Sequence, residues 1–355
     1  MSKIMIIIYL VLITIFTTMS NAVVCNNLPN LQIKLIKDFN KNYQDYIDYS
    51  DCLLSLNKID KNFTLSIKLI NTMIKKYGED SIHVQIAYLL LGRHYLFINR
   101  TQVADELLSF VEETKENERY EKKPHLNQVL LYLKGRVHED NKAYEKAIQL
   151  YQKALILNKN IKDEYNLSKL KILNRLADTF IEFSKPNEAL TYISQATQLE
   201  LKLKQNRGKD ATIDTIMIYA KLYENNKNYV KAASILYDEI ETHLKDKDKD
   251  LYFPKMLELL TQYSWNTLRL QQYTPTIFSA KLSLDIQNKL NINNSPFAVA
   301  NYFCMGFSEK YLKHNNKAKE YLKKSLNILT KIKMNNEEKN NYIKNINTLL
   351  LELDK

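Results

Sequence analysis

The sequence predicts an all-α chain of stacked antiparallel helix pairs, and three observations support this fold class. Only 5 Gly and 6 Pro occur among the 355 residues, whereas average usage is roughly 7% Gly and 5% Pro. Tight β-turns need such residues, so their scarcity excludes most β-rich folds. No stretch shows the alternating pattern of a strand. Small residues instead recur at a nearly fixed interval along the chain, as a helical repeat requires.

One segment shows the repeating unit most clearly. Residues 131–157 read LYLKGRVHEDNKAYEKAIQLYQKALIL. Gly135 allows a first helix to press closely on a second, and Ala147 is its small counterpart there. Tyr151 and Ala154 follow at i+4 and i+7, on the same face of the second helix. This spacing resembles the tetratricopeptide repeat, whose unit is an antiparallel pair of helices called A and B.

The same template occurs six times. The small helix-B residues lie 43, 42, 43, 44 and 42 residues apart: Ala104, Ala147, Ala189, Ala232, Thr276 and Ala318. The family's usual repeat is about 34 residues long, so each unit here is roughly eight residues longer, or about two helical turns. The fifth unit departs most, with Ser264 and Thr276 at the small positions. The resemblance implies a right-handed α-solenoid, or superhelix.

The pattern divides the chain into four parts. Residues 1–22 form a signal peptide, residues 85–334 hold the six repeats, and residues 335–355 form an amphipathic capping helix. Residues 23–84 are expected to form a divergent N-terminal helical hairpin, with a degenerate seventh repeat as the alternative. Its two apolar faces are Phe39, Tyr43, Tyr46 and Ile47 on one helix and Leu65, Leu69, Met73 and Tyr77 on the other.

The N-terminus predicts export to the periplasm or the extracellular space. Lys3 precedes an apolar run from Ile4 to Phe16, and the triplet 20–22 (Ser-Asn-Ala) provides small residues before a cleavage point after Ala22. The alternative is an uncleaved segment that anchors the chain to a membrane. In an oxidising compartment, Cys25 and Cys52 are the candidate pair for a disulfide.

The sequence lacks the common motifs of catalytic and cofactor sites. It has no glycine-rich nucleotide loop, no Gly-x-Ser-x-Gly elbow, no CxxC pair and no HExxH motif. We therefore expect no enzyme activity, no cofactor and no metal. The formal net charge of +11 is compatible with nucleic acid, an anionic membrane or an acidic partner. Export argues against nucleic acid, and compositional drift is the simplest source of the charge.

Two zones of the concave face are candidate binding sites. The resemblance implies that this face is lined mainly by helices A. The first zone contains Arg93, Phe97, Tyr132, Arg136, Lys171 and Asn174. Arg93 and Arg136 hold equivalent positions in adjacent repeats, which suits a shared carboxylate or an acidic peptide. Asn174 has both a donor and an acceptor for a peptide backbone. The alternative for the arginines is solvation or intramolecular pairing.

The second zone is apolar and contains Trp265, Phe303, Phe307 and Tyr311. Exposed aromatic side chains are typical anchors of a protein contact. The alternative is that Phe303 and Phe307 pack against the C-terminal helix and complete the core. Helix B of the last repeat carries Lys317, Lys319, Lys323 and Lys324, so membrane contact through this helix is a further alternative to a solvated face.

The functional prediction is an exported, noncatalytic scaffold that binds a protein or an extended peptide in its concave groove. The alternative is an extracytoplasmic sensor or assembly module of a membrane-anchored signalling or secretion system. The sequence leaves the partner and the oligomeric state open.

Overall fold

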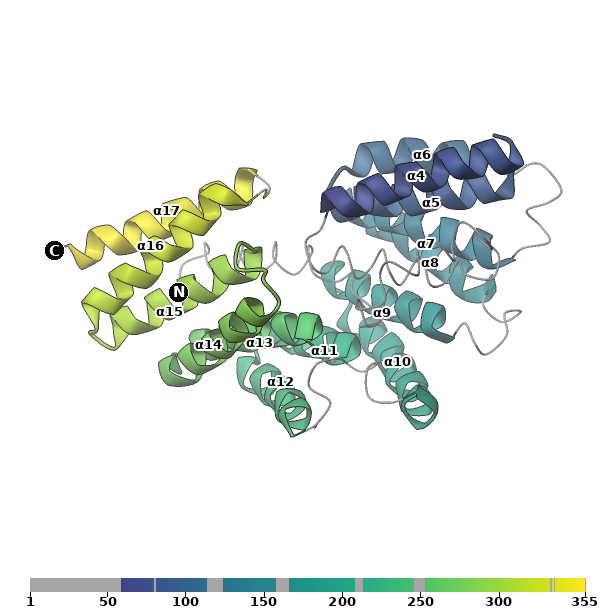
Figure 1. The fold of residues 1–355 in the computed structure, drawn as a ribbon. Coiled ribbons are helices and arrows are strands. Elements are labelled where there is room, and N and C mark those ends of the chain that lie inside the picture. The colour runs from purple at the N-terminus through teal and green to yellow at the C-terminus, as the bar shows by residue number, and fades with distance from the viewer. Residues whose placement is uncertain are drawn as a thin grey trace. The chain divides into compact units, whose positions relative to one another are not determined.

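The computed structural model describes residues 59–79, 81–113, 124–157, 166–207, 213–245, 253–332, 334 and 336–354. The predicted signal peptide and the Cys25–Cys52 pair lie outside these residues. Within them every regular element is an α-helix, which confirms the all-α fold class. Figure 1 shows the helices following one another as antiparallel pairs.

The helices alternate between the A and B positions of the repeat. The first described helix is α4 (Ile59–Tyr77) and the last is α17 (Asn336–Leu353). Between them lie six A/B pairs: α5 (Ile82–Phe97) with α6 (Thr101–Glu113), α7 (Pro124–Asp140) with α8 (Tyr144–Leu157), α9 (Asn166–Glu182) with α10 (Pro186–Arg207), α11 (Ile213–Asn225) with α12 (Tyr229–Leu244), α13 (Phe253–Arg269) with α14 (Tyr273–Lys289), and α15 (Pro296–Tyr311) with α16 (Asn315–Lys331).

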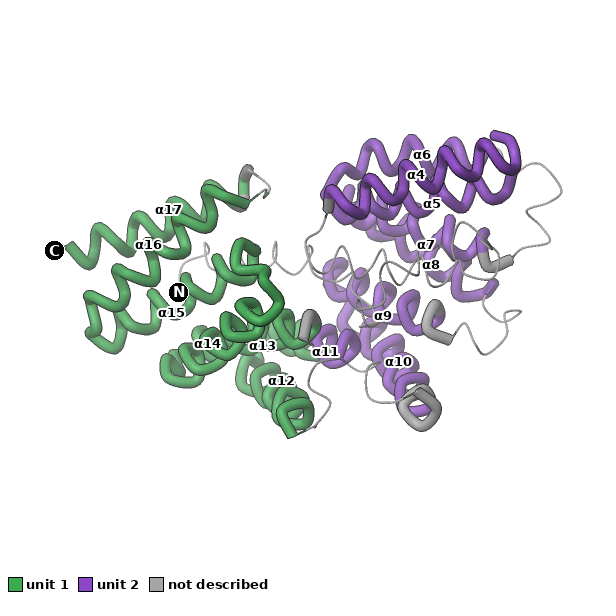
Figure 2. Tube along the Cα trace, viewed as in Figure 1, with its two compact units in different colours: residues 1–19, 219–355 green, residues 20–218 purple. Residues whose placement is uncertain are grey.

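These helices fall into two compact units (Figure 2). The N-terminal unit, as used below, comprises the described residues up to Ile218, and the C-terminal unit those from Tyr219 onward. In the N-terminal unit each helix from α4 to α10 packs on the next one, and helix A of one repeat also packs on helix A of the following one, α5 on α7. The C-terminal unit repeats this arrangement from α12 to α17, with α13 packed on α15.

The glycine positions explain the close approach of helices A and B. A Cβ built on Gly135 would lie 2.4 Å from Cε1 of Tyr151, and one built on Gly306 would lie 2.7 Å from Cγ of Leu322. At Gly92 the corresponding distance, to Cδ2 of Leu108, is 3.2 Å. Each glycine therefore faces the residue 16 positions later in the chain. No larger side chain fits at Gly135 or Gly306 without displacing a neighbour.

The fifth repeat replaces this apolar contact by hydroxyl pairs. Ser264 Oγ lies 2.7 Å from Ser279 Oγ, and Thr267 Oγ1 lies 2.9 Å from Thr276 Oγ1. All four side chains are buried. Because each hydroxyl has a partner, the polar residues do not leave an unpaired group in the interface. The repeat that departs most from the pattern thus keeps its packing.

All six turns between helix A and helix B have the same backbone geometry. Each contains three residues, and the middle one has a positive φ between 57° and 63°: Asn99, Lys142, Ser184, Lys227, Gln271 and Lys313. Two hydrogen bonds close each turn; in the second repeat, Ala143 N donates to His138 O at 2.8 Å and Lys142 N to Glu139 O at 2.8 Å. This is the Schellman motif, which usually places Gly at the left-handed residue. Here none of the six is Gly.

Candidate binding surface on the A helices

The first candidate zone lies entirely on the A helices of the N-terminal unit. Arg93 and Phe97 lie on α5, Tyr132 and Arg136 on α7, and Lys171 and Asn174 on α9. Arg93, Phe97, Tyr132 and Lys171 are half-buried, whereas Arg136 and Asn174 are buried. The structure thus brings residues from three consecutive repeats to one region of the fold.

Tyr132 lies at the electrostatic centre of this zone. Burial would raise the pKa of its phenol. The positive charges of four side chains outweigh burial and hold the pKa below its usual value: Arg175, Arg136, Lys171 and Arg93, in order of decreasing effect. Nearby positive charges favour the ionised form of a phenol. The zone therefore presents a positive potential, although it also contains carboxylates.

The carboxylates of this zone are held by groups deeper in the unit. Glu139 accepts a hydrogen bond from Tyr151 OH at 2.6 Å and one from Arg175 Nη1 at 3.3 Å. Arg175 Nη1 also lies 3.6 Å from Asp178 Oδ2. Burial alone would lower the pKa of Arg175, but these anionic neighbours, with Glu139 the strongest, raise it above its usual value. The guanidinium is therefore charged and engaged by both carboxylates.

Arg136 is less completely neutralised than Arg175. Its Nε lies 3.8 Å from Glu139 Oε2, which is an ion pair but too long for a hydrogen bond. That Nε is buried and makes no hydrogen bond within the described part of the chain. A buried donor without an acceptor costs free energy, so an additional acceptor supplied by a ligand would be favourable there.

Asn174 already contacts another side chain of the N-terminal unit. Its Oδ1 lies 3.0 Å from Thr215 Oγ1, whose single hydroxyl hydrogen is shared between Asn174 and Glu200. The side chain is buried. Its acceptor therefore already has one contact within the N-terminal unit, and a role for Asn174 in binding a peptide backbone stays a prediction.

The second candidate zone is not an open aromatic surface. Trp265 and Phe303 are 1% and 2% exposed. Their rings stack on each other with centroids 5.8 Å apart, and Tyr342 of α17 meets the Phe303 ring edge-on at 5.9 Å. Trp265 and Phe303 are therefore not the exposed anchors that we expected. The C-terminal helix covers Phe303 and extends the core. Phe307 is half-buried against the same cluster.

Tyr311 is the exposed member of this aromatic group, with 52% of its surface accessible. Its ring stacks on Phe307 at 4.8 Å and on Tyr273 at 5.3 Å. Lys310 Nζ lies 5.4 Å from the ring centroid. Of the four aromatic residues predicted for this zone, Tyr311 is therefore the most accessible to a partner.

The structure also reveals a buried polar group that the sequence did not predict. Glu224 of α11 is 4% exposed, and its Oε1 accepts hydrogen bonds from Gln262 Nε2 at 3.1 Å and Asn266 Nδ2 at 2.5 Å. Its Oε2 and the Oδ1 of Asn266 have no hydrogen-bond partner among the described residues. Burial raises the pKa of Glu224 to about 7, although the two amides and Arg269 oppose this effect.

The described residues contain no cluster of three or more His, Cys, Asp or Glu side chains able to hold a metal ion. Burial raises the pKa of the Cys304 thiol, so this side chain is a packed apolar group and a poor nucleophile. None of the described helices is both long enough and apolar enough to cross a membrane.

Comparisons with known proteins agree with this architecture. A family model described as a tetratricopeptide repeat matches residues 127–199, and no curated protein matches the chain in sequence. Among solved structures, the apo form of RapI has a TM-score of 0.58 at 14% identity, over 87% of this chain and 86% of that one. A Rap protein complexed with Competence and Sporulation Factor gives 0.56 at 15% identity, over 88% and 85%.

NprR in complex with its cognate peptide NprX gives a TM-score of 0.51 at 13% identity, over 89% of this chain and 84% of that one. At such identities these structures establish a shared fold alone. Residues 127–199 thus match the tetratricopeptide repeat, and the described helices on either side share the fold of such repeat proteins, with a period of about 42 residues.

Proposed function

We propose that this protein is a noncatalytic scaffold that binds a protein or an extended peptide across the A helices of the N-terminal unit, and that the bound segment carries an acidic group. The single observation behind this proposal is the gathering of four cationic side chains from α5, α7 and α9 around Tyr132, which lower the pKa of its hydroxyl against the effect of burial. A carboxylate placed beside the Tyr132 hydroxyl and Arg136 would meet a positive potential and an unused donor.

Two further points support a peptide or protein partner. NprR was solved with its cognate peptide and a Rap protein with Competence and Sporulation Factor, and both resemble this chain over more than four fifths of its length. The helix-A face of a repeat array also offers side chains from several repeats to one extended ligand. Nothing in the described residues suggests a reaction centre, which fits a binding role.

The experiment compares extended decapeptides of Gly and Ser that carry zero, one or three Asp residues. Their binding to the mature chain is measured by fluorescence anisotropy at low and at physiological salt. We expect affinity to rise with each Asp and to fall as salt is added. Arg93→Gln combined with Arg136→Gln should weaken binding of the three-Asp peptide about tenfold, the equivalent of about 1.4 kcal/mol.

The matched control is Lys146→Gln combined with Lys153→Gln. It removes the same charge from exposed positions of helix B, on α8. Circular dichroism establishes that both variants are folded. Equal weakening by the two pairs would show only a general charge effect, and affinity independent of Asp content would refute the acidic ligand.

We further propose that the chain acts outside the cytoplasm, on the basis of the N-terminal sequence. Mass spectrometry of the native protein tests this: a mature chain beginning at Val23 supports a cleaved, exported scaffold. An intact N-terminus in a membrane fraction favours the second candidate, a membrane-anchored sensor or assembly module, for which the apolar run from Ile4 to Phe16 is the specific observation.

A further inference from the structure

The hydroxyl of Tyr151 has no counterpart at the equivalent position of the five other repeats. The residues four positions after the small helix-B residue there are Leu108, Ile193, Leu236, Ala280 and Leu322. Helix B therefore packs on helix A without a hydroxyl at this position. Tyr151 is nevertheless 0% exposed, and a buried hydroxyl is normally hydrogen-bonded. The second repeat uses this atom for a contact that the other repeats lack.

The contact is with Glu139 of α7. Tyr151 OH donates a hydrogen bond to Glu139 Oε2 at 2.6 Å. Burial raises the pKa of Tyr151 and the charge of Glu139 raises it further, so the hydroxyl keeps its proton and acts as the donor. The other oxygen of Glu139, Oε1, accepts from Arg175 Nη1 at 3.3 Å. The carboxylate is therefore held by one group from α8 and one from α9.

The oxygen that Tyr151 holds is also the one that faces Arg136. Arg136 Nε lies 3.8 Å from Glu139 Oε2, and this buried Nε makes no hydrogen bond among the described residues. An N–H···O hydrogen bond needs about 2.7–3.2 Å, so a shift of roughly 1 Å would form one. Without the Tyr151 hydroxyl, Oε2 would be a buried acceptor beside a buried donor, and pairing would satisfy both.

We propose that Tyr151 is a positioning residue for the acidic-ligand site: its hydroxyl holds Glu139 away from Arg136, so that the Nε–H of Arg136 stays available to a carboxylate of the ligand. This role rests on the proposed function and adds to the site a buried residue that the ligand does not touch. Replacing Tyr151 by Phe changes neither the charge of the protein nor the ring that packs on Gly135. It should nevertheless weaken the binding of an acidic peptide, because Glu139 would then pair with Arg136.

A double-mutant cycle tests this role with the three-Asp decapeptide and fluorescence anisotropy. Tyr151→Phe should weaken binding about threefold, the size of one net hydrogen bond lost to the ligand. In a Glu139→Met background, which has no carboxylate to pair with Arg136, the same change should leave the affinity unaltered. Losses of equal size in both backgrounds would overturn the proposal, because they would show that Tyr151 acts through packing alone. So would an unaltered affinity for Tyr151→Phe in the natural chain.

Tyr192→Phe is the matched control. It removes one hydrogen bond of a tyrosine hydroxyl in the same unit, the 3.1 Å contact with Gln152 Nε2 between α8 and α10, and should leave the affinity unchanged. If it weakens binding as much as Tyr151→Phe does, the effect is not specific to the Glu139 contact and the proposal fails.

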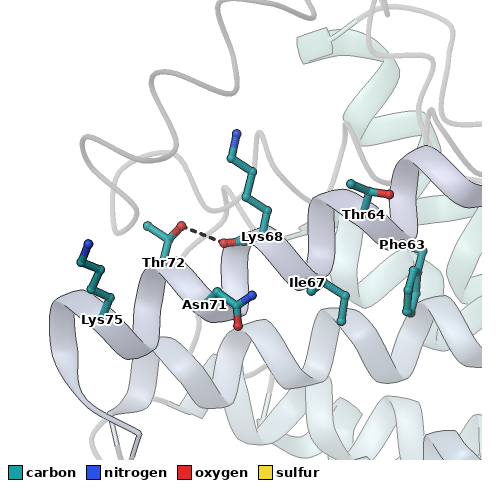
Figure 3. A pocket seen from close by; sticks show the side chains of 7 residues that line it. All are labelled: Phe63, Thr64, Ile67, Lys68, Asn71, Thr72 and Lys75. Atoms are coloured by element: carbon teal, nitrogen blue, oxygen red, sulfur yellow. Dashed lines mark hydrogen bonds between the residues drawn. The ribbon is translucent and has the colours of Figure 1, made fainter.

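The groove on α4 is a second place in the N-terminal unit where an acidic peptide could bind. Figure 3 shows its lining side chains, among them Phe63, Ile67, Lys68 and Lys75, along one face of the helix. Lys68→Gln combined with Lys75→Gln removes both lysine charges and should weaken binding no more than the control pair on α8 does. If it weakens binding further and Tyr151→Phe has no effect, the peptide occupies the groove and the proposal is wrong.

A measurement without peptide separates the positioning role from the proposed function. In protein labelled at its arginine nitrogens for NMR, the Nε–H resonance of Arg136, assigned by its loss in Arg136→Lys, reports on the hydrogen bonding of that group. Tyr151→Phe should move the proton resonance to higher frequency as the charged hydrogen bond to Glu139 forms, whereas Tyr192→Phe should not. An unmoved resonance would overturn the positioning role. If it moves and the natural chain binds no Asp peptide, the proposed function alone fails.

Discussion

Replacing Glu224 by Gln should stabilise the protein much more at pH 8 than at pH 5. Burial raises the pKa of this carboxyl from 4.5 to about 7. Each pKa unit corresponds to about 1.4 kcal/mol, so ionising Glu224 in the folded protein costs about 3 kcal/mol relative to the unfolded chain. Gln keeps an acceptor for Asn266 and Gln262 but carries no charge. It also places N–H donors where Oε2 is unpaired.

The sign of the effect follows from proton linkage. Between pH 4.5 and 7 the folded state binds more protons at Glu224 than the unfolded state does, so the free energy of unfolding falls as pH rises. Above about pH 8 both states are ionised and the full cost is present. The advantage of Glu224→Gln should therefore be below about 1 kcal/mol at pH 5 and should grow to about 3 kcal/mol at pH 8.

The single tryptophan of the chain provides the assay. Trp265 is buried on α13, next to Asn266, so its fluorescence reports on the helix that pairs with Glu224. Urea titrations at half-unit steps from pH 5 to 8 would compare the natural chain, Glu224→Gln and Glu145→Gln. Glu145 is exposed on α8 and serves as the control. If the natural chain and Glu224→Gln show parallel pH profiles, the reasoning is refuted.

The remaining predictions concern packing and turns. Gly135→Ala should destabilise the protein by about 1–3 kcal/mol, because the added methyl group would collide with Tyr151. Gly92→Ala should cost less, because its nearest neighbour is 0.8 Å further from the added Cβ (3.2 against 2.4 Å). Thermal unfolding would measure both variants, and equal losses of stability would contradict this reasoning. Tyr342→Ala should lower the free energy of unfolding by about 3 kcal/mol, because it removes the side chain that packs on Phe303. It should also shift the fluorescence emission of Trp265 to longer wavelength, and an unchanged emission spectrum would contradict this coupling. Lys142→Gly should stabilise the protein by about 0.5–1 kcal/mol, because Gly adopts the left-handed φ of this position without strain. The neighbouring Asn141→Gly, the control, should bring no such gain. Urea titration would detect the difference, and a less stable Lys142→Gly variant would show that the turn is not strained.

The repeat could be predicted from the sequence because small residues at a fixed spacing report directly on helix contacts. Gly135 and Ala147 indicated where the two helices meet, and the structure places them there. Small residues at a constant period therefore allowed the contact between helices A and B to be recognised from the sequence. The turn conformation was less evident, since Lys142 and its equivalents are not glycine.

The candidate sites were less predictable because a periodic pattern shows which face of a helix a residue lies on but not what covers it. Phe303 lies on helix A as expected, yet α17 covers it. Arg175 was missed because its position is one residue beyond those that the family pattern assigns to the groove, although it holds Glu139 and Asp178. Glu224 gave no signal, since its burial depends on Gln262 and Asn266 in the next repeat, about 40 residues later.

The constant turn inside each repeat also shows where this chain has tolerated changes in length. Helix A and helix B are separated by three residues in all six repeats, but 10, 8, 5, 8 and 6 residues separate each helix B from the next helix A. A residue added to the A–B turn would break both hydrogen bonds of its Schellman motif, whereas a longer B–A connection costs only a little loop entropy. An epitope tag or a fused domain should therefore be accepted between Glu113 and Pro124, the longest of these connections, and rejected between Asp140 and Tyr144.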